Sequence, residues 1–294
     1  MQKIAYLVLI LLWSTTPLAI NWSVQGVPFS LALAGRFGLA AALGLLVLLL
    51  SRKKIPRSSW PAAACAGAST ALSMLCVYWA SLTVSSGLVA VLFGLIPLAT
   101  AGFSWLWLGL SLNRGELLAM AMGMTGLFII FAEKLSLSGV AGVLAVLIAV
   151  LIQAAAAVKL KTLAVGQSPL AVNAGALAIA AVLLSIVCTM QTSSLAWNFP
   201  SQSMLAIAYL AVFGSVLGFS LYYWLIRECK PITVSLISII TPASALWMGH
   251  SLNAEVISGA LIGGTACILL GLMVHLLAQP RREASPYHKV HFGK

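Results

Sequence analysis

Long apolar runs follow one another along almost the whole chain, separated only by short polar stretches. A hydrocarbon core about 30 Å thick requires roughly 20 helical residues to cross it. Because lipid offers no hydrogen-bond partners, segments of this length are predicted to be helices that pair their own backbone groups. We therefore expect an all-α membrane protein with ten transmembrane helices, at residues 4–21, 29–50, 61–82, 85–107, 115–132, 139–160, 169–190, 203–226, 232–249 and 256–278.

The few charged residues are distributed as membrane topology requires. Only 7% of the 294 residues are charged, and the net charge of +11 is divided among short clusters instead of forming one patch for nucleic acid. If the N-terminus is cytoplasmic, 14 Lys and Arg residues lie on that side, Lys134 lies on the other, and Arg36 lies inside a helix. The sequence thus predicts a multi-pass protein of the bacterial inner membrane with both termini in the cytoplasm and a basic tail at 280–294.

The two halves of the chain repeat one another. A Tyr-Trp pair followed 19 residues after its Tyr by a proline occurs at 78–97 and again at 223–242. Residues 109–113 and 249–253 differ only at their second position, and Glu116 and Glu255 follow them. We predict two domains of five helices, 1–135 and 136–279. Because five is odd, the second would enter the membrane from the opposite side, an inverted repeat typical of alternating-access transporters that bind substrate near the midplane.

Short motifs of both halves, in this order and spacing, resemble the EamA domain of the drug/metabolite transporter superfamily. They are Trp13-Ser14, Arg36-Phe37, Ser85-Ser86-Gly87, Leu95-Ile96-Pro97-Leu98, Leu108-Gly109, Gly115-Glu116-Leu117-Leu118, Gly123-Met124-Thr125-Gly126, Tyr222-Tyr223-Trp224 and Thr241-Pro242. The family usually has Gly-Glu where this chain has Gly109-Leu110 and Gly249-His250. The resemblance implies ten helices with both termini cytoplasmic and, usually, efflux of amino acids or other metabolites.

Arg36 is the strongly ionised side chain that lies well within a predicted span. A charge at membrane depth costs roughly 2.5–3.5 kcal/mol even on the lenient insertion scale, so such a residue normally faces a polar cavity. Three roles are compatible with the sequence: contact with substrate, a gate or helix-positioning role, and a side chain that snorkels outward.

Aromatic and uncharged polar residues complete the candidate substrate site. Tyr78 and Tyr223 are repeat-equivalent, and Gln153 corresponds to Trp13 at an offset of 140 residues. An aromatic face with a polar tip suits a half-apolar ligand, although ordinary packing and interhelical hydrogen bonds are the alternatives. The predicted substrate-binding set is Trp13, Ser14, Arg36, Tyr78, Gln153 and Tyr223, and the predicted helix-break or gating residues are Pro17, Pro97 and Pro242.

Enzymatic and cofactor chemistry find no support in the sequence. There is no Asp, every Glu falls outside the predicted spans or at their ends, and no cysteine pair has metal-ligand spacing. We therefore expect no catalytic residues, no metal and no cofactor. Because proton-driven carriers usually place a titratable group inside the membrane, we also expect movement without obligatory proton exchange.

The sequence as a whole predicts an alternating-access carrier that exports small neutral or zwitterionic metabolites such as amino acids, aromatic ones included. Its expected partners are that solute and the bilayer, no nucleic acid, and at most a weak homodimer. One alternative is a carrier of phosphorylated sugars or nucleotide-sugars. Such a carrier would need several cationic residues in its cavity, whereas the interiors of the predicted spans provide only Arg36. The other is a membrane scaffold or receptor that transports nothing.

Overall fold

The computed structural model describes residues 2–133, 137–191, 200–218, 220–222, 225 and 237–278. Tyr223, the tail at 280–294 and parts of the predicted spans at 203–226 and 232–249 lie outside these residues. The regular secondary structure within them is entirely helical, which confirms the predicted class. The elements are α1 (Gln2–Ser23), α2 (Phe29–Leu50), η1 (Arg57–Ser59), α3 (Trp60–Ala80), α4 (Ser86–Phe93), α5 (Ile96–Leu108), α6 (Arg114–Ala132), α7 (Leu137–Leu163), α8 (Pro169–Gln191), α9 (Ser201–Tyr209), η2 (Leu210–Leu217), α12 (Ile237–Asn253) and α13 (Gly259–Ala278).

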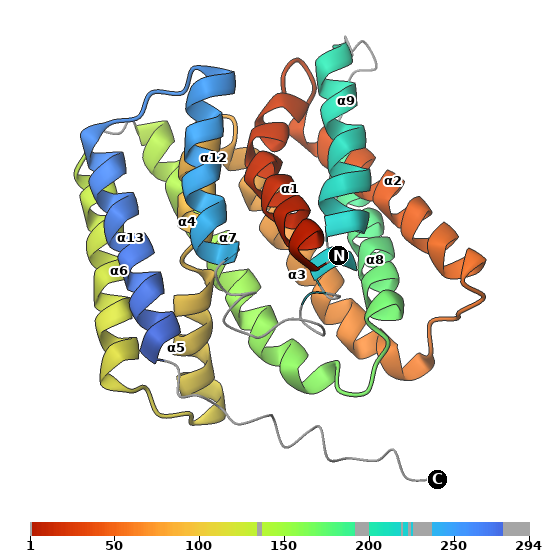
Figure 1. Ribbon diagram of the computed structural model, residues 1–294. Helices are drawn as coiled ribbons and strands as arrows, with labels where there is room; N and C mark the ends of the chain where they lie inside the picture. The colour runs from red at the N-terminus through yellow and green to blue at the C-terminus, as the bar shows by residue number, and fades with distance from the viewer. Residues whose placement is uncertain are drawn as a thin grey trace.

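Nine stretches of the described chain are long and apolar enough to cross a membrane. The remaining predicted span corresponds to α12, whose 17 described residues begin after the gap at 226–236. Loops join successive helices at two ends of the bundle, called here the upper end and the lower end as they lie in Figure 1. The upper end carries the loops at 24–28, 81–85 and 254–258, and the lower end carries those at 51–59, 109–113 and 164–168.

The fourth predicted span consists of two helices, α4 and α5, and not of one. Pro97 stands in the first turn of α5 and has no N–H to donate to the carbonyl four residues earlier. The chain therefore tightens at the junction, where Leu95 N–H donates to the carbonyl of Leu92 at 3.0 Å. Gly109, at φ 63°, then ends α5 in the left-handed conformation that glycine adopts without steric cost.

Helix packing relates the two halves by an approximate twofold. The pairing of α3 with α7 is matched by that of α1 with α9, and the pairing of α1 with α12 is matched by that of α5 with α7. In the pairs α6–α13, α4–α12 and α2–α8, each helix packs against the helix that has the same position in the other repeat. The most extensive contacts among the described helices thus all run between the first repeat, α1–α6, and the second, α7–α13. The two repeats are interleaved, and α7 descends from the upper end where its counterpart α1 ascends to it (Figure 1).

Glycines let α6 and α13 pack with their backbones nearly touching. A Cβ added at Gly126 would lie 2.5 Å from the carbonyl oxygen of Gly264, and one added at Gly271 would lie 2.9 Å from that of Ala119. Small residues play this part in membrane helices because lipid provides no hydrophobic drive for association. Gly264 and Gly271 of α13 therefore serve contact within the chain, whereas Gly259 and Gly263 face no close neighbour.

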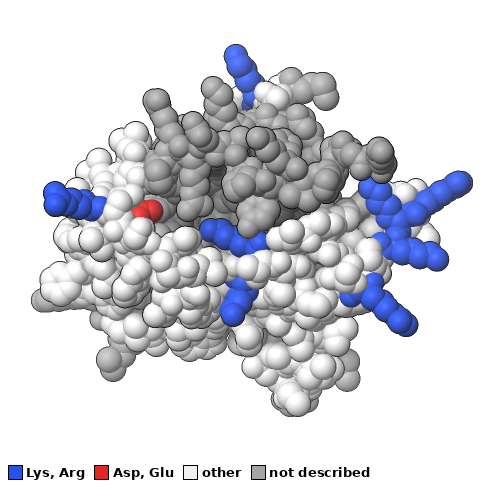
Figure 2. All heavy atoms as spheres, turned by 90° about the horizontal axis from the view of Figure 1, so that it is seen from below, with Lys and Arg blue, Asp and Glu red and all other residues white. Residues whose placement is uncertain are grey.

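Basic side chains gather at the lower end, as Figure 2 shows from below. The exposed Lys and Arg residues at the lower-end loops and helix termini are Arg52, Lys53, Lys54, Arg57, Arg114, Lys159 and Lys161. The last two lie within α7, which extends three residues beyond the predicted span, to Leu163. Lys159 rests over the ring of Trp107 at 5.0 Å, a cation–π contact that binds α7 to the end of α5.

Candidate functional site

Arg36 lies two turns into α2 and is 4% exposed. Its Nε donates to the hydroxyl of Ser215 at 3.3 Å and its Nη1 donates to the hydroxyl of Tyr78 at 3.4 Å. The guanidinium also sits 5.1 Å from the ring centroid of Phe37 and 6.0 Å from that of Tyr78. These contacts bring α2 and α3 of the first repeat together with η2 of the second. The side chain points into the protein and does not snorkel to the surface.

This cation donates hydrogen bonds to neutral partners. Both acceptors are hydroxyls at the long end of the hydrogen-bond range. No ion pair joins Arg36 to a carboxylate within the described part of the chain. A guanidinium has five N–H groups and stays charged at all relevant pH values. A planar anionic group such as a carboxylate matches this chemistry, because it accepts two parallel N–H bonds from one guanidinium.

Helix α1 borders the same region through three consecutive hydroxyl residues, of which the structure satisfies two. Thr15 Oγ1 lies 2.6 Å from the hydroxyl of Tyr209, and Thr16 Oγ1 donates to the carbonyl of Leu12 at 2.7 Å. The hydroxyl of Ser14 is buried without a hydrogen-bond partner. Such back-bonding hydroxyls and Pro17 inside α1 weaken its hydrogen-bond ladder at this depth.

Gly214, inside η2, and Gly218, the C-cap of η2, face α1 and α2. A Cβ added at Gly214 would lie 3.6 Å from Arg36 Nη2 and 3.7 Å from Thr16 Oγ1, and one added at Gly218 would lie 3.2 Å from Trp13 Nε1. η2 is a π-helix, a wider turn that recurs at functional sites. The wide turn and its glycines bring the backbone of the second repeat up to Arg36 and Trp13.

An aromatic pair joins α1 to the second repeat, seven residues along the chain from Ser215. The rings of Trp13 and Tyr222 are 4.9 Å apart at an interplanar angle of 44°. Trp13 is half-buried and packs on the small cluster of Leu9, Leu225 and Ile237. Tyr223 was predicted as a site residue because it is the repeat-equivalent of Tyr78, and the neighbouring Tyr222 was not predicted.

The predicted site residues are only partly brought together. Arg36 and Tyr78 touch, Trp13 lies nearby, and Ser14 is buried on the same helix as Trp13. Gln153 is half-buried on α7 and takes part in none of the contacts that build the cluster. Ser215 and Tyr209 were not predicted, since a lone Ser or Tyr in an apolar run gives no signal of its own.

Of the three prolines predicted to break helices, Pro97 alone stands at an interruption, the α4–α5 junction, whereas α1 is continuous through Pro17 and α12 is continuous through Pro242. Pro242 is buried, and its Cγ is 3.5 Å from the position of a Cβ added at Gly94 in the α4–α5 junction. The repeat-equivalent of Pro97 thus packs against the interruption of the first repeat, where α4 and α12 contact each other and α1.

Sequence comparison resolves the class of the protein. The profile of the EamA-like transporter family matches the chain twice, over residues 3–132 and 140–277. The chain belongs to the EamA-like transporter family. It is 29% identical over 286 residues to the uncharacterized inner membrane transporter YedA of Escherichia coli K12, covering 91% of this chain and 90% of YedA. It is 24% identical over 290 residues to Protein PagO of Salmonella typhimurium LT2, covering 94% and 93% of the two chains.

A solved crystal structure shares the fold of this EamA-like transporter. The two superpose with a TM-score of 0.68 at 21% sequence identity, over 94% of this chain and 96% of the other. The double match confirms the predicted family and the two EamA repeats. It also confirms that the protein belongs to a transporter family and not to an enzyme family.

Proposed function

We propose that this EamA-like transporter exports small neutral or zwitterionic metabolites, such as large neutral and aromatic amino acids, by alternating access. The location that we propose is the inner membrane, where YedA is named as a transporter. The moving units would be residues 1–135 and 136–279, and 280–294 would form a basic cytoplasmic tail. Efflux is the direction that the EamA resemblance favours.

The observation that carries the proposal is the environment of Arg36. A buried guanidinium between the two repeats is bonded to two neutral hydroxyls, and a carboxylate would complete its coordination. Removing a charge from water is expensive unless it is paired, so an anionic group of the substrate is favoured here. One cation suits a monoanionic or zwitterionic ligand better than a multiply phosphorylated one.

The aromatic pair of Trp13 and Tyr222 would accommodate the other end of the ligand. Trp13 and Tyr222 offer apolar faces with polar edges, which suit a side group that is partly apolar. A permanently cationic drug would be repelled by Arg36. The faces of these rings would offer it only about 0.5–2 kcal/mol each.

The test is counterflow in proteoliposomes that contain the purified protein. Vesicles are loaded with one unlabelled solute, and uptake of the labelled solute is compared for large neutral amino acids and for quaternary ammonium cations, with and without a proton gradient. We expect saturable counterflow of the amino acids that needs no gradient. Strong, gradient-dependent movement of the cations would contradict both the ligand class and the expected mode of transport. Absence of saturable movement for every solute would favour the non-transporting alternative.

A further inference from the structure

We propose that Glu255, in the loop between α12 and α13, is a gating residue that holds the upper end of the transporter closed and must release for that end to open. This inference concerns the transport cycle itself and does not depend on the identity of the solute. It rests on the contacts of one carboxylate, on the helices that these contacts join, and on the different behaviour of the repeat-equivalent Glu116.

The carboxylate of Glu255 caps the first turn of α4 across the boundary between the repeats. Its Oε1 accepts hydrogen bonds from the backbone N–H of Ser86 at 3.0 Å and from the hydroxyl of Ser86 at 2.6 Å. Its Oε2 accepts the backbone N–H of Gly87 at 3.0 Å. Bonds of this kind between an anion and a helix N-terminus are charge-assisted and gain from the helix dipole.

The loop that carries Glu255 is folded so as to aim its side chain at α4. Ala254 adopts a left-handed φ of 50°, and Glu255 N–H donates back to the carbonyl of Gly249 at 3.2 Å. His250 Nδ1 lies 2.8 Å from the carbonyl of Glu255, and Asn253 Nδ2 donates to Glu255 Oε1 at 3.1 Å. A non-glycine residue in the left-handed region costs roughly 1–2 kcal/mol, so this turn is maintained by its surroundings.

Glycine is required where the two helices approach each other. A Cβ added at Gly87 would lie 2.7 Å from Leu246 Cδ1 and 3.0 Å from Leu246 Cα, and one added at Gly249 would collide with the carboxylate of Glu255. Neither position has room for a side chain while α4 and α12 are in contact. The close approach therefore belongs to the latched arrangement.

The same loop reaches α1, so the latch joins three helices of the upper end. Asn253 accepts the indole N–H of Trp22 at 3.1 Å. The neighbouring Asn21 donates to the carbonyl of Ser81, the C-cap of α3, at 3.1 Å. The end of α1, the start of α4 and the end of α12 are thereby fastened by polar contacts that include both repeats.

The equivalent glutamate of the first repeat is engaged differently. Glu116 accepts the backbone N–H of Asn113 at 2.9 Å, and Asn113 accepts that of Glu116 at 2.9 Å, a capping box within α6 itself. Two residues that correspond in sequence thus make unlike contacts at opposite ends of the molecule. Alternating access requires that the two ends differ in any one state. The carboxylate of Glu255 bonds across the repeats at the upper end, whereas at the lower end it is Asn113, and not Glu116, that does so, by donating its Nδ2 to the carbonyl of Ala278 at 2.8 Å.

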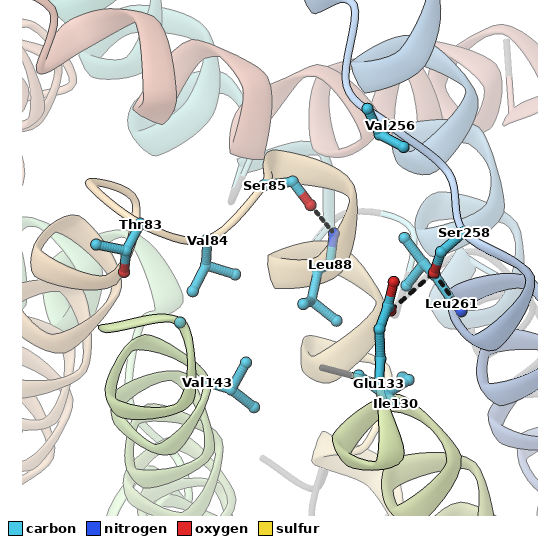
Figure 3. Close-up of a pocket in the computed structure, with 11 residues that line it drawn as sticks. Thr83, Val84, Ser85, Leu88, Ile130, Glu133, Val143, Val256, Ser258 and Leu261 are labelled. Atoms are coloured by element: carbon cyan, nitrogen blue, oxygen red, sulfur yellow. Dashed lines mark hydrogen bonds between the residues drawn. The ribbon is translucent and has the colours of Figure 1, made fainter. Parts of the chain in front are cut away.

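There is room beside α4 for the latch to open. A hollow of about 190 Å³ lies next to the start of α4, walled by Ser85 and Leu88 on one side and by the loop residues Val256 and Ser258 on the other (Figure 3). Glu133, at the end of α6, accepts the hydroxyl of Ser258 there at 2.7 Å. This hollow is at the upper end, away from the Arg36 cluster, and α4 could tilt into it once its cap is lost.

The experiment measures how readily water reaches the upper end of α1. The five native cysteines are replaced, and Ser23, which is 0% exposed, is changed to cysteine as a reporter in the full chain in lipid nanodiscs. Its rate of labelling by a polar maleimide is measured with Glu255→Gln and Glu255→Ala added in turn. We expect the rate to rise about tenfold for Glu255→Ala, which corresponds to a shift of ~1.4 kcal/mol in the open population, and less for Glu255→Gln.

A matched variant separates gating from mere stability. Glu116→Gln neutralises the repeat-equivalent glutamate at the lower end, which does not cap α4, and it should not raise the labelling rate. A fall in thermal stability with unchanged labelling in the Glu255 variants would make Glu255 an ordinary structural cap and overturn the proposal.

A cross-link provides the converse test and does not depend on a weakened latch. Ser86→Cys with Glu255→Cys places two thiols where the latch is now closed, with Ser23 left as serine and a new reporter, Ser14→Cys, deeper on α1. Bridging the pair with a short bis-thiosulfonate should suppress labelling of the reporter, measured on its own peptide by mass spectrometry, and reduction should restore it. Equal labelling of the bridged and the reduced protein would refute the gating role.

Discussion

At the scale of single residues, the functional centre is a buried cation whose recorded hydrogen bonds go to neutral groups. Arg36 could be singled out from the sequence because a charge in an apolar run is conspicuous and costly. The hydroxyl of Ser215 and the ring of Tyr222 could not. Each comes from the second repeat, and only the packing of η2 against α1 and α2 brings it near. Tyr78 was found through its repeat partner, yet the contact that matters joins it to Arg36.

We predict that Arg36→Ala reduces transport roughly thirtyfold while the protein still purifies as a folded species. Removing one partner of a buried charge pair with the substrate costs about 2 kcal/mol or more, whereas removing the desolvated cation relieves the fold of its burial cost. Arg36→Lys should restore little, because an ammonium cannot make two parallel bonds to a carboxylate. Counterflow and thermal unfolding of both variants measure this, with the exposed Arg57→Ala as control. Unchanged transport in Arg36→Ala would assign Arg36 to the fold alone.

We predict a smaller effect for Tyr78→Phe, which removes a hydroxyl and keeps the ring. The lost bond to Arg36 is long, so about 1 kcal/mol, or roughly fivefold in apparent affinity, is expected. Tyr209→Phe loses a hydroxyl bond to Thr15 and not to Arg36, so its effect should fall on stability. Apparent KM from concentration-dependent counterflow separates the two. An equal rise in KM for both variants would argue against a specific role of Tyr78.

At the scale of elements, the spans were largely predictable, and their interruptions were not. Helix ends agree within a few residues because length and apolarity decide where lipid can be crossed. Pro97 signalled a bend, but the complete break at Gly94 and Leu95 depends on α4 and α5 each packing against different neighbours, α12 and α7. The π-turn of η2 has no proline to mark it. It follows from contacts with α1 and α2.

We predict that the α6–α13 pair tolerates no side chain at Gly264. An added Cβ would lie 2.5 Å from Ile130 Cγ1 and 2.6 Å from the carbonyl oxygen of Gly126, so Gly264→Ala should destabilise the protein by about 1–3 kcal/mol. Gly263→Ala is the matched control, since an added Cβ there meets only Ile129 Cγ2 at 3.9 Å. Thermal unfolding in the same detergent compares them, and equal stability of the two variants would contradict the tight pairing.

At the scale of the whole molecule, the charge at the lower end predicts its orientation. Lys and Arg are retained on the cytoplasmic side during insertion, so we expect the lower end to face the cytoplasm. A single cysteine replacing Gln25, exposed at the upper end, should react with an impermeant reagent in intact cells. One replacing Lys54, exposed at the lower end, should react only after the cells are opened. Labelling of the Lys54 position in intact cells would reverse the assignment.

The interleaving of the repeats also governs how the protein comes into being. Translation proceeds from the N-terminus, so α1 to α6 enter the membrane before most of the helices against which they pack have been synthesised. The first half is therefore in the membrane before its packing partners. Acyl chains cover the glycine face of α6 until α13, the last described helix, displaces them. Assembly therefore finishes only near the end of synthesis. We expect a chain that stops after Ala132 to stay unassembled and to be degraded by the proteases that clear unassembled membrane proteins.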